Sequence, residues 1–384
     1  MNIAYGSSAT TGSSPHIAPP MMIDAGYMRE AGATVKQAVG TPILLAGRFN
    51  QPQLAETALA AGEADMIGMT RAQIADPQMA NKAREGRVDD IRACIACNQA
   101  CLDHTFEGKS VSCLVNPRAA HETILNYEPT ANAKKIAVIG AGPAGMSYAT
   151  VAAERGHNVT LFDTASEIGG QFNLAKQVPG KEEFVETLRY YKRMLEIHNV
   201  DVRLNSTVSA EQLKQSDFDH VVIATGITPR TPDIEGIDHP SVVSYIDVIH
   251  GNCEVGKRVA VMGAGGIGFD VSELITHSGV SGAVDRDVFA KEWGIDFENH
   301  PRGGVTGVKP EIAKADREVY LLQRKSSPVG RGLGKTTGWT HRISLAQSGV
   351  KMLNGLEYHK LHDQGENIST DGMTPGLSGA SVTV

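Results

Sequence analysis

The chain lacks the features that mark membrane, secreted and nucleic-acid-binding proteins. No segment approaches the roughly 20 apolar residues that a bilayer-spanning helix needs, and the N-terminal stretch has neither the basic flank nor the apolar run of a signal peptide. Lysine and arginine (36) are outnumbered by aspartate and glutamate (43), and a net charge of −7 without a basic run argues against a nucleic-acid binder. We therefore expect a cytoplasmic protein that acts on a small molecule, and the sequence leaves its oligomeric state open.

Cysteine is scarce as well: the chain has five, and four of them lie between residues 94 and 113. A tight group of this kind fits metal ligation in a reducing cytosol better than the disulfide framework of a secreted protein. Cys94, Cys97, Cys101 and Cys113 can supply the four thiolates that usually hold one [4Fe–4S] cluster. Structural zinc is the alternative, but the uneven C-x2-C-x3-C-x11-C spacing resembles no common zinc ribbon. Cys253 stands apart and is predicted to have no part in this site.

Residues 1–90 alternate apolar runs of strand length with helical patterns. TPILLAGRF and ADMIGMTR are two of the runs, and such alternation indicates parallel strands joined by crossover helices. The first run ends near Arg48 and the second ends at Arg71. Because the last two βα loops of a (β/α)8 barrel commonly bind a phosphate, the two arginines predict a flavin phosphate site. Two ordinary solvated arginines are the alternative.

A dinucleotide-binding pattern begins at Lys134. KKIAVIG is typical of a strand, GAGPAG of a tight turn and MSYATVAAERG of a helix, and HNVTLFD forms a second strand that ends at Asp163. The turn glycines Gly140, Gly142 and Gly145 let the backbone approach a pyrophosphate, which meets unpaired N–H groups at the helix N-terminus. Asp163 lies where an acid can accept a hydrogen bond from a ribose hydroxyl.

A second glycine turn lies in KRVAVMGAGGIGFDVSELITHSG, with no acid at the expected distance behind it. An insertion over 279–316, rich in glycine, proline and charge, separates this turn from the strand REVYLLQ. That strand leads into Arg324 and Lys325. Two cations there favour the 2′-phosphate of NADPH over NADH, although ordinary surface charges fit the pattern equally well.

Together these motifs resemble the bacterial 2,4-dienoyl-CoA reductase and trimethylamine dehydrogenase group of iron–sulfur flavoproteins, within the NADH:flavin oxidoreductase family. The resemblance covers nearly all of residues 30–360. It rests on AGRF, MTRAQIADP, CIACNQACLDHTFEGKSVSCLVNPRA, GAGPAG, EIGGQFNLAKQVPGKEEF, ATGITPRTP, GAGGIGFD and LQRKSSPVGRGLGKTTGW. It implies an α/β protein with five parts: the C-terminal part of an FMN-binding (β/α)8 barrel (1–90), a [4Fe–4S] segment (91–133), an incomplete FAD-binding domain (134–235), an NAD(P)-binding domain (236–365) and an irregular tail (366–384). The FAD-binding and NAD(P)-binding domains are expected to be Rossmann-like.

The resemblance also implies which residues bind each cofactor. The FMN phosphate would meet Gly47, Arg48, Thr70 and Arg71. FAD would contact Gly140, Gly142, Gly145, Asp163, Gly170, Gln171 and Gly226. NADPH would contact Gly263, Gly265, Gly268, Arg324 and Lys325. No catalytic residue can be carried over, because the chain begins at what looks like the sixth barrel strand.

The group's chemistry implies electron flow from NADPH to FAD, then singly through the cluster to FMN, and finally to an enoyl-CoA thioester. An amine or N-methyl amino-acid dehydrogenase of the same superfamily is a second interpretation. Since the pattern is incomplete at both ends, we expect the chain to be a fragment. A third interpretation is therefore an inactive fragment that only binds nucleotides.

Overall fold

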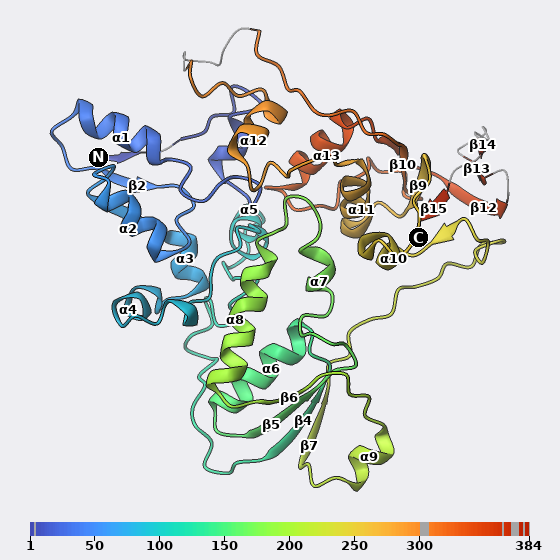
Figure 1. Ribbon diagram of the computed structural model, residues 1–384, viewed down its shortest axis with the longest axis horizontal. Coiled ribbons are helices and arrows are strands. Elements are labelled where there is room, and N and C mark those ends of the chain that lie inside the picture. The colour runs from blue at the N-terminus through green and yellow to red at the C-terminus, as the bar shows by residue number, and fades with distance from the viewer. Residues whose placement is uncertain (4, 300–306, 363–364, 370–375, 379–380, 384) are drawn as a thin grey trace. The chain divides into compact units, whose positions relative to one another are not determined.

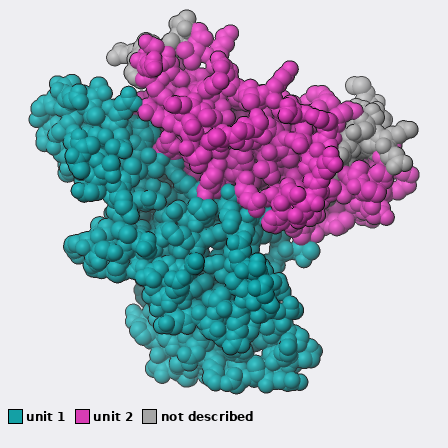
Figure 2. Space-filling view, viewed as in Figure 1, with its two compact units in different colours: residues 1–4, 25–176, 183–228 teal, residues 5–24, 177–182, 229–384 magenta. Residues whose placement is uncertain are grey.

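The computed structural model describes residues 1–3, 5–299, 307–362, 365–369, 376–378 and 381–383 (Figure 1). The chain forms two compact units, which are coloured separately in Figure 2. The first unit comprises Met1–Ala4, Ala25–Lys176 and Glu183–Thr228, and the second comprises Tyr5–Asp24, Gln177–Glu182 and Pro229–Val384. The polypeptide therefore crosses between the units several times. Over the described ranges, no helix combines the length and the apolar character needed to cross a membrane.

Three short parallel strands open the first unit. They are β1 (Asn2–Ile3), β2 (Leu44–Ala46) and β3 (Met66–Gly68), in the order β1-β2-β3. The helices of this part are α1 (Arg29–Ala38), α2 (Pro52–Ala60), α3 (Thr70–Ala75) and α4 (Met79–Arg84). Ile43, Leu45 and Ala58 are completely buried, so strands and helices share one apolar core. Parallel strands with crossover helices confirm the predicted α/β class.

The cysteine segment has little regular structure. It contains a π-helical turn (Gln99–Asp103) that runs into the short helix α5 (His104–Phe106), and the 3-10 turn Val88–Asp90 precedes it. Asn98 adopts the left-handed conformation, with φ of +61°, directly before the π-helical turn. Asparagine is one of the few residues that tolerate this conformation, and it bends the chain between two of the cysteines.

The segment after Lys134 folds into a four-stranded parallel sheet. Its strands, in spatial order, are β6 (Asp201–Arg203), β5 (Asn158–Phe162), β4 (Lys135–Ile139) and β7 (His220–Ile223). The helices are α6 (Pro143–Glu154), α7 (Phe172–Ala175), α8 (Phe184–Ile197) and α9 (Ala210–Gln215). Helices α6 and α8 lie on one face of the sheet (Figure 1), and Met146 of α6 shares a buried core with Leu161 of β5. Tyr190 and Tyr191 of α8 belong to the same core.

The second unit is built around a five-stranded sheet, all of whose pairings are parallel. Its order is β11 (Lys351–Leu353), β10 (Glu318–Leu322), β9 (Arg258–Met262), β15 (Ser381–Thr383) and β8 (Val242–Val243). A separate antiparallel sheet joins β12 (Glu357–His362), β13 (Gly365–Ser369) and β14 (Gly376–Ser378). The helices are α10 (Tyr245–His250), α11 (Gly266–Thr276), α12 (Arg286–Trp293) and α13 (Gly338–Gln347).

Within the tail over 366–384, the described residues 366–369, 376–378 and 381–383 lie in strands. Strand β15 inserts between β9 and β8, and β14 pairs with β13. The prediction of an irregular tail is therefore wrong for these strands. Backbone N–H and C=O groups can pair into a sheet even where glycine and serine leave no hydrophobic alternation to read.

The insertion over 279–316 contains a helix that the sequence analysis missed. Asp285 accepts hydrogen bonds from the N–H groups of Asp287 and Val288, both at 3.0 Å, and so caps the start of α12. Phe289 and Trp293 are buried on this helix. The helix was missed because its apolar residues are few and stand among charges.

A histidine is buried in the second unit. The ring of His16, in the 3-10 turn Ser14–Ile17, meets the rings of Tyr5 and Phe289 edge-on, with centroid distances of 5.3 and 5.9 Å. Burial lowers the pKa of His16 from 6.5 to about 4. The imidazole is therefore neutral at pH 7.

Candidate functional site

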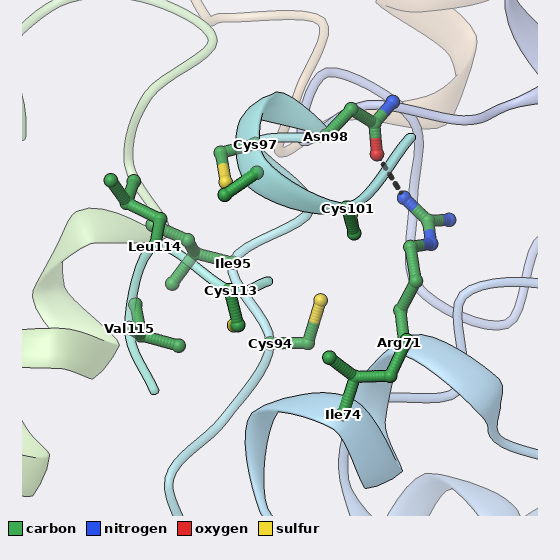
Figure 3. A pocket seen from close by; sticks show the side chains of 11 residues that line it. Arg71, Ile74, Cys94, Ile95, Cys97, Asn98, Cys101, Cys113, Leu114 and Val115 are labelled. Atoms are coloured by element: carbon green, nitrogen blue, oxygen red, sulfur yellow. Dashed lines mark hydrogen bonds between the residues drawn. The ribbon is translucent and has the colours of Figure 1, made fainter. Parts of the chain in front are cut away.

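All four grouped cysteines line one cavity in the first unit (Figure 3). Cys94 and Cys97 precede the π-helical turn, and Cys113 follows it. Because all three line the cavity, the stretches of chain before and after this turn meet there. The other lining residues are Arg71, Ile74, Ile95, Asn98, Ala100, Leu114 and Val115. Four soft sulfur donors inside largely apolar walls suit an iron–sulfur cluster.

The donor set fits a cluster, although the thiols are not drawn together as finished metal ligands. Among the residues that the structure describes, no group of three or more cysteine, histidine or acidic side chains is placed to hold an ion. Burial raises the pKa of Cys97 to about 12 and also raises the pKa values of Cys101 and Cys113. Such thiols keep their protons at neutral pH until a metal displaces them. The cluster stays a prediction that the shared cavity supports.

One arginine reaches the cysteine cavity from the barrel side. Nη1 of Arg71, on α3, donates a hydrogen bond to Oδ1 of Asn98 at 2.5 Å (Figure 3). The positive charge of Arg71 partly opposes the burial that raises the pKa of Cys101. Arg71 was predicted to bind a flavin phosphate, and the structure gives it a partner inside the cysteine loop.

A second arginine ties together the two ends of the cysteine segment. Arg92 donates from Nη1 to Oδ1 of Asn116 at 2.9 Å and from Nη2 to the hydroxyl of Tyr190 at 2.6 Å. Its guanidinium carbon lies 4.5 Å from the centre of the Tyr190 ring, within range of a cation–π interaction. Asn116 in turn donates to the carbonyl of Ile74 at 2.9 Å. The barrel part, the cysteine segment and α8 are thus joined by one polar network.

The other residues of the predicted FMN phosphate site do not form a group of positive charge that is open to a phosphate. Arg48 forms an ion pair with Glu183, the residue before α8. A side chain at Gly47 would lie 2.5 Å from Cγ of Met28, so this glycine is needed for close packing. Thr70 is exposed at the start of α3. The FMN site remains a prediction, and no reaction step is derived through it.

The first glycine turn has the shape that a pyrophosphate cradle needs. A side chain at Gly145 would meet the carbonyl oxygen of Gly140 at 1.8 Å, which fixes the close approach of α6 to the turn. Gly170 folds back over the turn, since a Cβ there would lie 3.0 Å from Cα of Gly142. The N–H of Gly169 donates to the carbonyl of Ala141 at 2.8 Å and holds this arrangement. The bare backbone at the start of α6 fits a dinucleotide phosphate.

The acid at the end of β5 supports this turn directly. Oδ2 of Asp163 accepts from the N–H of Ala141 at 2.6 Å, and Oδ1 accepts from the N–H of Ala165 at 2.8 Å. The predicted contact with a ribose hydroxyl stays a prediction. Gln171 and Gly226 are exposed, at the start of α7 and after β7 respectively, and the φ of Gly226 is +76°.

The second glycine turn lies between β9 and α11 and is open. Nothing lies within 4 Å of a Cβ built at Gly263 or Gly265, whereas one at Gly268 would meet the carbonyl oxygen of Gly263 at 1.9 Å. Arg324 and Lys325 follow β10, and both are exposed. The side-chain amide of the preceding Gln323 donates to the carbonyls of Lys325 and Ser327, at 3.0 and 2.7 Å, and so shapes this loop.

The chain segment 177–182 crosses into the second unit and is anchored there. Nζ of Lys181 lies 2.5 Å from Oδ1 of Asp270, on α11. The N–H of Gly180 donates to the hydroxyl of Ser281 at 3.2 Å. Burial raises the pKa of Asp270, and the Lys181 charge opposes this effect.

Sequence reasoning missed the polar residues that organise these sites. They are Asn98, Arg92, Asn116, Glu183, Lys181 and Asp270. Each stands within or beside a motif that was noted for another reason. Their partners lie far away in the chain. A single sequence contains no signal that identifies the partner of a charged or amide side chain.

Two family models match the chain. The pyridine nucleotide-disulphide oxidoreductase family matches residues 134–380, and the NADH:flavin oxidoreductase / NADH oxidase family matches residues 11–90. The second match falls on the barrel part and the first on both glycine turns.

Similar proteins combine both parts in longer chains. The NADH oxidase of Thermoanaerobacter brockii is 33% identical over 97% of this chain and 58% of its own length. The N,N-dimethylglycine/sarcosine dehydrogenase of Chromohalobacter salexigens is 32% identical, over 87% and 44%. The solved structure of a 2-naphthoyl-CoA reductase with 2-naphthoyl-CoA has a TM-score of 0.84 at 30% identity, over 100% and 52%.

The chain thus spans about half the length of these proteins. Its glycine turns, its parallel sheets and both family matches agree on one class of enzyme. The chain belongs to the pyridine nucleotide-disulphide oxidoreductase family over residues 134–380, and residues 11–90 match part of the NADH:flavin oxidoreductase / NADH oxidase family.

Proposed function

We propose that this chain is the nucleotide-oxidising and electron-relaying portion of an iron–sulfur flavoprotein of the 2,4-dienoyl-CoA reductase type. The four thiols around one cavity carry this proposal. Direct hydride exchange between a nicotinamide and a flavin needs no such site, whereas single-electron transfer to a second flavin does. We expect the protein to act in the cytoplasm, where its thiols stay reduced.

The chain's own contribution is to hold the cofactors. The turn between Gly140 and Gly145 would receive the FAD pyrophosphate on the N–H groups of α6. Arg324 and Lys325 would place the 2′-phosphate of NADPH. When bound, FAD and NADPH supply two-electron chemistry and the [4Fe–4S] cluster supplies one-electron transfer toward FMN.

An enoyl-CoA thioester is the substrate class that we propose for the whole protein. The likeness to a reductase solved with an aryl-CoA thioester supports this class. An amine or N-methyl amino-acid dehydrogenase is the second candidate, and the likeness to the dimethylglycine/sarcosine dehydrogenase favours it. The two candidates differ in whether electrons enter at the nicotinamide site.

Stopped-flow mixing with NADPH tests the proposal on protein reconstituted anaerobically with iron, sulfide and FAD. We expect rapid bleaching of the flavin band, followed by slower loss of the broad iron–sulfur absorbance. Zinc or no metal in the reconstituted protein would defeat the cluster assignment. A bound flavin that NADPH does not reduce would favour the amine dehydrogenase, or an inactive fragment if dimethylglycine fails as well.

A further inference from the structure

The cysteine cavity has one ionic side chain besides its thiols. Among the described residues that line it, Arg71 alone carries a full charge, while Ile74, Ile95, Leu114 and Val115 are apolar. Solvent screens a charge poorly behind such walls, so its effect on the cavity is stronger than on an open surface.

The hydrogen bond to Asn98 holds this charge beside the cysteine loop. Asn98 is 1% exposed and follows Cys97 directly in the chain. Its side-chain oxygen accepts from Arg71, so the guanidinium is held between α3 and the cysteine loop (Figure 3). An arginine that served only a flavin phosphate would need no partner in this loop.

We propose that Arg71 sets the reduction potential of the cluster held by the four cysteines. This inference rests on the proposed iron–sulfur function. When a cluster with four thiolate ligands accepts one electron from a reductant, its negative charge increases by one. A fixed neighbouring cation stabilises the reduced form more than the oxidised form, and so raises the potential. No bond forms or breaks at Arg71, which acts only through its charge and position.

The test is a redox titration of the full chain with dithionite and mediators, followed by the EPR signal of the reduced cluster. We expect Arg71→Gln to lower the reduced-to-oxidised ratio at a fixed potential about tenfold, which corresponds to about 59 mV for one electron. Arg71→Lys keeps the charge and should retain most of the wild-type potential. Arg84→Gln removes an exposed arginine on α4 and should leave the potential unchanged.

Asn98→Asp provides a second route if Arg71→Gln fails to fold. Aspartate tolerates the left-handed conformation, and its carboxylate would neutralise Arg71 without removing it. We expect the same direction of shift. A change of less than twofold in both variants would overturn the inference. Both titrations are run with and without added FMN, because a shift seen only with FMN would show that Arg71 acts through the flavin phosphate. Wild-type protein that holds no iron would overturn the proposed function as well.

Discussion

Arg48 forms an ion pair with Glu183, although the two residues lie 135 positions apart in the chain. The Arg48 side chain is 2% exposed, and Glu183 directly precedes α8. The sequence suggests that Arg48 binds a phosphate, but in the structure its buried side chain pairs with Glu183. Removing one partner of such a pair leaves the other charge buried without compensation.

Glu183→Ala should destabilise the first unit by about 3 kcal/mol, since the buried Arg48 charge would lose its ion-pair partner. Hydrogen exchange of α8 measures the loss. Glu196→Ala, an exposed position at the other end of α8, is the control and should change little. Unchanged exchange in Glu183→Ala, together with loss of FMN binding in Arg48→Ala, would restore the phosphate assignment.

Cys94→Ser should abolish formation of an intact cluster, because oxygen is a poor substitute for a thiolate toward iron. Iron and acid-labile sulfide are measured after anaerobic reconstitution. Cys253→Ser should match the wild type, since Cys253 does not line the cavity. Equal iron loss in the two variants would show that the cavity is not the binding site.

Gly142→Ala and Gly145→Ala should separate binding from folding at the first glycine turn. A Cβ at Gly142 comes no closer than 4.0 Å to its nearest neighbour, so this variant should fold but bind FAD at least about tenfold more weakly. Gly145→Ala forces the turn to move and should cost about 2 kcal/mol or more in stability. FAD fluorescence titration and thermal unfolding distinguish the two effects. Wild-type affinity in Gly142→Ala would rule out the proposed cradle.

Replacing both Arg324 and Lys325 by alanine should weaken NADPH binding about 100-fold and leave NADH binding unchanged. A charge-assisted hydrogen bond contributes about 1.5–3 kcal/mol, which is roughly tenfold or more for each residue. Dissociation constants for the two nucleotides give the comparison. Lys314→Ala, an exposed charge in the insertion, controls for net charge. Equal losses for NADPH and NADH would contradict a 2′-phosphate site.

The second unit should lose stability as the pH falls from 6.5 toward 4. His16 has a pKa of about 4 when folded and 6.5 when unfolded, so the unfolded chain binds more protons in this window. The loss should reach about 3 kcal/mol below the folded pKa. Both tryptophans, Trp293 and Trp339, lie in this unit, and their fluorescence in urea reports its unfolding.

His16→Leu should flatten this pH dependence because it removes the titrating group. Replacing His121, an exposed histidine of the first unit, by glutamine should leave the dependence intact. Parallel pH profiles for wild type and His16→Leu would mean that another group is responsible.

Much of the fold was readable from local patterns. The parallel strands around β2 and β4 and both glycine turns follow from short-range periodicity and from the conformational freedom of glycine. The four cysteines were grouped because they are close in the chain, and all four line one cavity. What local patterns cannot supply is the partner of a long polar side chain. Arg48 and Arg71 therefore received the same predicted role, while the structure gives them Glu183 and Asn98.

The interleaving of the two units limits how this protein can be dissected. A cut after Thr228 would leave the N-terminal piece with every stretch of the first unit. The C-terminal piece would lack both His16 and Lys181, and the apolar surface around Phe289 and the acid at Asp270 would lose those neighbours. A C-terminal piece that begins after Thr228 would therefore lack two stretches of the second unit, Tyr5–Asp24 and Gln177–Glu182.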